Sequence, residues 1–196
     1  MKSLNSKWGR KNQLELYMTR GGVPHYLKEL NPSQSAAQSI DALCFQPDGA
    51  LHYEFANIYH ALFDHVERHI TIIEALASKP QGFTRQSIAE ATKLPSGGTL
   101  TKYLTDLEES GFIQPMPEWG KARKAVVYRL IDEFSYFYLK WMKGKSTQKA
   151  GHWLTVRNFP KWRAWSGYAF EGLCHRHVNK LEEALGISGV HTKIAS

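Results

Sequence analysis

The residues best suited to chemistry in this sequence are hydroxyl and basic side chains that could contact DNA. One group lies at the start of a helical segment, and the other lies in a short basic stretch that follows it. Lysine and arginine bind phosphate through their charge, while threonine can hydrogen-bond to base edges. The predicted DNA-binding residues are Thr99, Thr101, Lys102, Lys121, Arg123 and Lys124.

The elements that must position these side chains occur in the order of a winged helix-turn-helix. Helical periodicity predicts helices near 64–78, 84–93 and 98–110. Gly111 ends the third helix, and two β-rich runs within 112–130 predict one β-hairpin. Helix, helix, turn, helix and hairpin define the motif, which we place at 64–131. In a DNA-reading version the third helix enters the major groove and the hairpin loop, or wing, contacts phosphate. The inward residues expected on the third helix are Leu100, Tyr103, Leu104 and Leu107.

Charge favours contact through the wing over deep base readout by the third helix. Residues 64–111 hold five basic and seven acidic side chains, whereas 112–130, with Arg129, holds four basic and one acidic. Asp106 and Glu109 are among the acids expected on the outer side of the third helix. We therefore expect DNA affinity to be modest and only weakly dependent on base sequence. Many winged helices instead pack on a neighbouring domain or dimerise, and this alternative stays open.

Composition indicates a globular chain with room for one or two domains. Of the 196 residues, 42% are hydrophobic and 22% charged, and the net charge of +7 weakly favours acidic partners such as nucleic acid. Cys44 and Cys174 have no CxxC spacing, which indicates buried or free thiols in a reducing compartment. The sequence shows no apolar signal segment and no run of membrane-spanning length, so we expect a cytoplasmic protein without membrane contact.

Some kinds of site are not expected here. No GxxxxGK[ST] phosphate loop occurs, since Pro115 stands where the first glycine before Gly120 and Lys121 would be. We therefore expect no binding or hydrolysis of ATP, and no cofactor. His175 and His177 are two residues apart, so on a helix they point to different faces and make a poor metal pair.

Several segments have both a structural and a functional interpretation. Gly21 and Gly22 either form a corner between helices, which propensity favours, or let the backbone approach a ligand. The aromatic run 134–141 is typical of a core rather than of a base-stacking platform. The segment 153–165 mixes tryptophans with basic residues. We interpret it as a docking edge in preference to a nucleic-acid surface. Glu171 lies among apolar residues in the sequence. We interpret it as a rim or capping acid in preference to a catalytic acid.

Three segments together resemble a known family. They are GGVPHYL at 21–27, YRLIDEF at 128–134 and WSGYAFE at 165–171, in this order. They look like the C-terminal part of the archaeal-type AAA+ ATPases of prokaryotes, over about Leu14 to Val190. In that family a P-loop domain precedes an α-helical lid, the winged helix follows, and a domain similar to the PD-(D/E)xK nucleases comes last.

The resemblance implies a division of the chain into three parts. Residues 1–63 would be a helical lid-like segment and 64–131 the winged helix. Residues 132–196 would be aromatic-rich helices and the first helix of a truncated nuclease-like domain, where Glu171 would match an acid of the nuclease core. The P-loop and the strands carrying the other nuclease carboxylates and lysine have no counterpart in this sequence, so no catalytic residue and no metal are expected.

The expectation is therefore a mainly α fold with one β-hairpin and a non-catalytic function. The chain would be a fragment or a shortened relative of an AAA+ ATPase that acts as a DNA-binding winged-helix module. The alternative is a protein-interaction module that docks on an ATPase subunit or forms a homodimer, without DNA contact. An autonomous enzyme is not expected.

Overall fold

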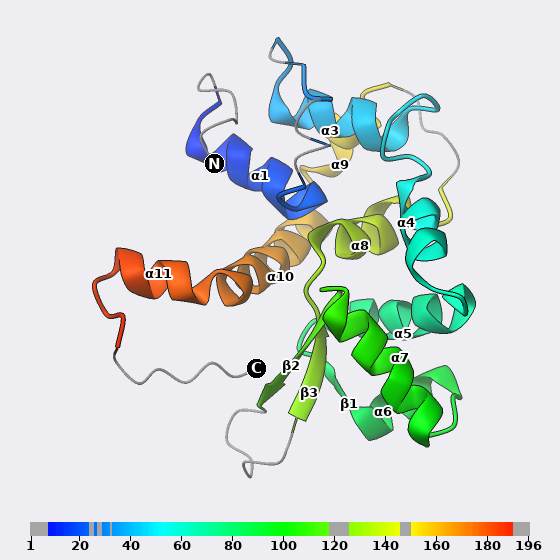
Figure 1. Cartoon of the computed structure of the whole chain (residues 1–196). Coiled ribbons are helices and arrows are strands. Elements are labelled where there is room, and N and C mark those ends of the chain that lie inside the picture. The colour runs from blue at the N-terminus through cyan, green and yellow to red at the C-terminus, as the bar shows by residue number, and fades with distance from the viewer. Residues whose placement is uncertain are drawn as a thin grey trace. The chain divides into compact units, whose positions relative to one another are not determined.

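The computed structural model describes residues 8–23, 26, 29–31, 33–117, 126–145 and 150–189. The chain is mainly helical, with one small antiparallel sheet of three strands (Figure 1). It forms two compact units. Unit 1 comprises Met1–Ala61 and Glu133–Phe170, and unit 2 comprises Leu62–Asp132 and Glu171–Ser196. Residues 132–196, expected as a third segment, are thus divided between the two units.

Unit 2 contains the helices and the hairpin expected around residues 64–131. Helices α5 (Val66–Ser78), α6 (Arg85–Thr92) and α7 (Gly98–Glu109) confirm the three predicted helices. Strands β2 (Ile113–Pro117) and β3 (Val126–Leu130) form the predicted hairpin (Figure 1). The apolar stripes of the helices and the inner face of the hairpin form the core. Its buried residues include Ile72, Ile73, Leu76, Ile88, Leu100, Tyr103, Leu104, Leu107, Phe112, Ile113 and Val127.

A third strand, β1 (Phe83–Thr84), was not predicted and lies immediately before α6. It pairs antiparallel with β3, so the sheet order is β1-β3-β2, with Phe83 opposite Tyr128. A strand of two residues is too short to show an alternating pattern, because one period already fills it. Gly82 precedes it with φ +97°, and a Cβ there would lie 2.8 Å from the Tyr128 carbonyl oxygen. Glycine is therefore required where the chain crosses β3.

Unit 1 packs N-terminal helices on the aromatic helices that follow the hairpin. Helix α1 (Arg10–Arg20) contacts α3 (Ala36–Phe45) and α8 (Glu133–Phe137), and α3 contacts α9 (His152–Val156). Other elements described in or partly in this unit are α4 (Glu54–Leu62), a π-helical turn η1 (Tyr138–Met142), and the first part of α10 (Pro160–Arg176). The aromatic run contributes to the core, as expected: the buried rings of the unit include Phe45, Phe55, Tyr59, Phe134, Tyr136, Phe137, Trp141, Trp153 and Trp165.

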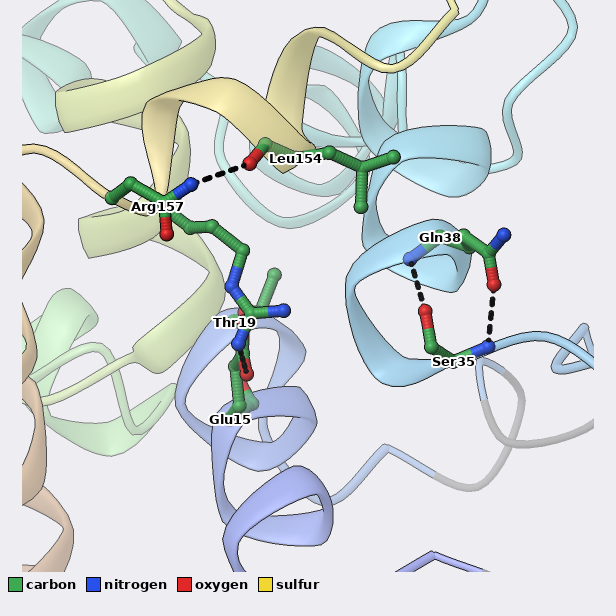
Figure 2. A network of polar contacts seen from close by, with 7 residues as sticks. Glu15, Thr19, Ser35, Gln38, Leu154 and Arg157 are labelled. Atoms are coloured by element: carbon green, nitrogen blue, oxygen red, sulfur yellow. Dashed lines mark hydrogen bonds and ion pairs between the residues drawn. The ribbon is translucent and has the colours of Figure 1, made fainter.

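Local hydrogen bonds explain where two of these helices begin and end. Ser35 and Gln38 form a reciprocal capping box at the start of α3, in which each side chain accepts from the other's backbone N–H (Figure 2). Gly21 ends α1 with φ +67°, and its N–H donates to the Tyr17 carbonyl at 2.8 Å. A Cβ at Gly21 would lie 3.0 Å from Glu133 Oε2, so a side chain here would meet the buried carboxylate. Gly21 therefore has the structural role of a helix corner.

Buried charges in unit 1 join segments that are far apart in the sequence. Arg157, at the end of α9, donates through Nη2 to Glu15 Oε2 on α1 at 3.0 Å (Figure 2). Burial raises the pKa of Glu15, and the Arg157 guanidinium opposes this rise. Burial also lowers the pKa of Arg20 to about 10. The positive charge of Arg157 is balanced by the Glu15 carboxylate inside unit 1.

The C-terminal helices are α10 and α11. Helix α10 begins at Pro160, where a proline suits the first turn of a helix. Helix α11 (Val178–Ala184) buries no residue along its length, and Leu181 is 42% exposed. Of the helices that the structure describes, none combines the length and the apolar character needed to cross a membrane.

Candidate nucleic-acid interface

The predicted DNA-binding residues of the third helix lie on the open side of α7. Thr99, Thr101 and Lys102 are exposed, as is Thr105 one turn later. Thr101 and Thr105 are four residues apart, so Thr101, Lys102 and Thr105 share one face of the helix. The opposite face is held in the core by residues such as Leu104. The first two turns of α7 therefore present hydroxyl and ammonium groups to the solvent.

Arg85 joins this surface and was not predicted from the sequence. It is the first residue of α6, directly after the N-cap Thr84. Its Nη2 donates to the carbonyl oxygens of Ser96 and Gly97, the latter at 2.9 Å, and to Thr101 Oγ1 at 3.0 Å. One guanidinium thereby braces the turn between α6 and α7 and adds a positive charge beside Thr101. The only sequence signal was a basic residue beside a helix cap.

The acidic residues of α7 are less uniformly exposed than the sequence suggested. Glu108 and Glu109 are exposed at the C-terminal end of the helix. Asp106, in contrast, pairs with the buried His69 on α5. The distance between His69 Nε2 and Asp106 Oδ2 is 3.2 Å. Asp106 was expected on the outer side of the third helix, and it is only partly exposed there. Local periodicity does not reveal its partner His69, which is 37 residues away on another helix. The N-terminal half of α7 is the less acidic half.

His69 fixes α7 against α5. Its Nδ1 faces the His65 carbonyl oxygen at 3.0 Å, while Nε2 faces Asp106. Each ring nitrogen of His69 therefore faces an oxygen atom, one on its own helix and one on α7. The ring of Phe63 stacks on His69 at 4.0 Å between centroids, and Tyr103 meets its edge at 4.9 Å. This contact sets the position of the helix that carries Thr101 and Lys102.

Replacing Asp106 with alanine is expected to destabilise unit 2 by about 2 kcal/mol, because the buried His69 Nε2 loses its acceptor. Denaturant unfolding followed by circular dichroism measures the change. Glu109→Ala removes the same charge from the exposed face of the same helix and should cost about 0.5 kcal/mol or less. Equal losses for the two variants would contradict a structural role for the His69–Asp106 contact.

The structure shows that one of the four basic side chains counted in the wing region is not open to solvent. Arg129, counted among its basic residues, is 4% exposed and donates through Nη1 to Glu171 Oε1 at 2.8 Å. It is therefore paired inside unit 2 and not open to phosphate. Lys121, Arg123 and Lys124 lie outside the residues that the structure describes, so the wing half of the predicted site stays a prediction.

The side chain of Glu171, whose sequence neighbours are apolar, is 48% exposed and accepts a hydrogen bond from Arg129. Besides Arg129, its Oε1 lies 3.5 Å from His175 Nε2 one helical turn away. This pairing with a buried arginine explains why a carboxylate is present there.

Cys44 is buried, and burial raises the pKa of its thiol. In the described ranges, no three His, Cys, Asp or Glu side chains lie close enough together to hold a metal ion.

Comparisons with known proteins give this chain no relative. No protein-family model matches it, and neither a curated protein nor a solved structure shows significant similarity to it.

Proposed function

We propose that residues 64–131 form a winged helix-turn-helix that binds DNA. The order of elements supports this, because α5, β1, α6 and α7 are followed by the β2–β3 hairpin, and β1 completes a small sheet. In such a unit α6 and α7 are the two helices of the helix-turn-helix, and the loop between β2 and β3 is the wing.

The observation that carries the proposal is the surface around Arg85. Its guanidinium braces the α6–α7 turn and lies against Thr101, beside the exposed Lys102. The N-terminal end of α7 adds the positive end of its helix dipole to these charges. Hydroxyl and cationic groups on a rigid helix-turn-helix suit a phosphate backbone and the rim of the major groove.

The expected contact is mainly electrostatic. Lys121, Arg123 and Lys124 would bind phosphates from the wing while Thr99, Thr101 and Lys102 meet the groove. Glu108 and Glu109 would repel DNA from the C-terminal half of α7. Affinity should therefore be modest, with little dependence on base sequence.

We further propose that the chain is a non-catalytic, cytoplasmic relative of the C-terminal part of the archaeal-type AAA+ ATPases. In that proposal the N-terminal helices of residues 1–63 correspond to the lid. The helix corner at Gly21, which faces the Glu133 carboxylate, agrees with a structural use of the GGVPHYL segment. The pairing of Glu171 with Arg129 likewise supports a structural use of the WSGYAFE segment.

Removing the three wing charges should weaken the salt dependence of DNA binding. Fluorescence anisotropy of a labelled duplex at several salt concentrations gives the slope of log K against log salt. The variant Lys121→Ala, Arg123→Ala, Lys124→Ala should flatten this slope by up to roughly 3, since each phosphate contact contributes about 0.9.

The matched control has the same loss of charge elsewhere. Lys11, Lys79 and Lys180 are exposed and lie outside the proposed interface, so their triple alanine variant should retain the wild-type slope. If both variants flatten the salt slope equally, the effect comes from the net charge of the chain and not from the wing positions. If wild type shows no salt-sensitive binding even at low salt, the DNA proposal fails.

A second candidate, docking on a protein partner, is favoured by the C-terminal residues of unit 2. Leu181, Leu185 and Ile187 are 42%, 72% and 37% exposed around helix α11. Exposed apolar side chains that form one patch are typical of a contact surface, and these three lie on α11 or within three residues of its end. A negative result in the DNA experiment would leave docking, on an ATPase subunit or a second copy of the chain, as the function to test.

A further inference from the structure

A strongly basic stretch of unit 1 lies outside the proposed winged helix. Residues 134–170 hold seven basic side chains and no acidic one. The whole chain has a net charge of +7, so the rest of the sequence is neutral on balance. Positive charge concentrated in one stretch of a folded unit indicates a surface for an anionic partner.

Three lysines of this stretch are placed on the aromatic cluster of unit 1. The Lys145 and Lys161 ammonium groups lie over the same indole ring, at 5.5 and 5.6 Å from the Trp141 centroid. The Lys140 ammonium lies 5.9 Å from the centroid of Tyr136. Lys145 and Lys161 are exposed, whereas Trp141 is buried beneath them. The rings therefore hold the cations by cation–π attraction without covering them.

Two carboxylates of unit 1, Glu15 and Asp41, have partners other than these lysines. Glu15 is paired with Arg157, and Asp41 accepts from the backbone N–H groups of Gly151 and Trp153. Burial lowers the pKa of Lys140 and Lys145, and the positive charge of Lys161 lowers the pKa of both further. Such mutual repulsion is relieved when an anion enters among the ammonium groups.

Two aromatic side chains lie next to Lys161 in the sequence. Phe159 is 53% exposed just before α10. Trp162 is half-buried, and its ring stacks on the buried Trp165 with 4.8 Å between centroids and 29° between planes. Proteins that bind single-stranded nucleic acid combine basic side chains for the backbone with aromatic rings on which bases stack.

We propose that Lys140, Lys145 and Lys161, with the rings of Phe159 and Trp162, form a binding site for single-stranded nucleic acid. The ammonium groups would contact phosphates, and the exposed ring of Phe159 and the half-buried ring of Trp162 would stack with bases. This site belongs to unit 1 and does not depend on the DNA-binding role proposed for unit 2. It also assigns a nucleic-acid-binding function to the segment 153–165, which we interpreted from the sequence as a docking edge.

The test is the binding of the full chain to a labelled oligothymidylate of roughly 15 nucleotides, a length in the range that single-strand-binding folds cover. In the variant Lys145→Gln, Lys161→Gln we expect affinity to fall by about tenfold and the salt slope to flatten by about 1.4, because each phosphate contact on a single strand contributes about 0.7. Phe159→Ala should weaken binding by about fivefold through lost stacking. The rescue variant Lys145→Arg, Lys161→Arg keeps both charges and should bind like wild type.

Three further measurements make the outcome decisive. The control Lys11→Gln, Lys180→Gln loses the same charge at exposed positions and should change affinity by about twofold or less. The wing variant Lys121→Ala, Arg123→Ala, Lys124→Ala should leave oligothymidylate binding unchanged, whatever it does to duplex binding. Equal losses in the two lysine pairs, or no salt-sensitive binding by wild type, would overturn the proposal. Binding to anionic phospholipid vesicles without binding to the oligonucleotide would overturn it as well.

Discussion

Replacing Trp153 with alanine is expected to destabilise unit 1 by about 4 kcal/mol, the largest effect of a single substitution proposed for this chain. The ring is fully buried and contacts four others. It stacks on Phe45 at 5.5 Å and meets Phe137, Trp141 and Trp162 edge-on at 5.1, 5.5 and 5.0 Å between centroids. Alanine would leave a large cavity among rings that cannot all move to fill it.

Denaturant unfolding followed by tryptophan emission measures this loss, since Trp141, Trp162 and Trp165 remain as reporters in the same unit. Trp153→Phe keeps most of the apolar volume and should cost clearly less than the alanine variant. Phe159→Ala removes an aromatic ring that is 53% exposed, and should cost about 1 kcal/mol or less. A loss for Trp153→Ala as small as that for Phe159→Ala would show that the cluster does not hold unit 1 together.

Replacing Asp41 with alanine is expected to destabilise unit 1 by about 3 kcal/mol, through lost hydrogen bonds instead of lost packing. Asp41 on α3 is 6% exposed and caps a helix 110 residues away in the sequence. Its Oδ1 accepts from Trp153 N at 2.7 Å, and its Oδ2 accepts from Gly151 N at 2.8 Å and from Gln46 Nε2 at 3.1 Å. Without the carboxylate, two backbone N–H groups at the start of α9 lose their acceptor.

The same unfolding measurement applies, with two comparison variants. Asp41→Asn retains one acceptor oxygen, so its loss should be intermediate. Asp48→Ala removes an exposed aspartate from the turn after α3 and should change stability by about 0.5 kcal/mol or less. If Asp41→Ala and Asp48→Ala lose equal amounts, the long-range cap contributes nothing to stability.

Much of unit 2 could be predicted because its signals are local. The four inward residues expected on α7 are all buried, since a period of 3.6 places Leu100, Tyr103, Leu104 and Leu107 on one side of a helix. The hairpin was likewise indicated by the change of pattern after Gly111, whose φ of +75° ends the helix. Strand β1 was missed because two residues show no period, and its pairing with β3 depends on residues more than 40 positions away.

The candidate sites were predictable only in part, for a related reason. Thr99, Thr101 and Lys102 were placed outward by helical spacing, and they are exposed. Arg85 was missed because its contact with Thr101 crosses a turn whose geometry no single-residue preference sets. The lysines over Trp141 were missed because cation–π contacts join residues from η1, the segment after it and α10.

By itself, the sequence determined helices α5, α6 and α7 of unit 2, the hairpin and the uneven distribution of charge along the chain. These follow from backbone hydrogen bonds between near neighbours, from side-chain period and from counting charges. Only the tertiary structure decided which charged groups are engaged and which face solvent. Arg129, Asp106 and Arg157 each pair with a residue at least 37 positions away, whereas Lys145 and Lys161 remain exposed. The physical reason is that ion pairing depends on distance in space, and packing brings together residues whose separation along the chain carries no local signal.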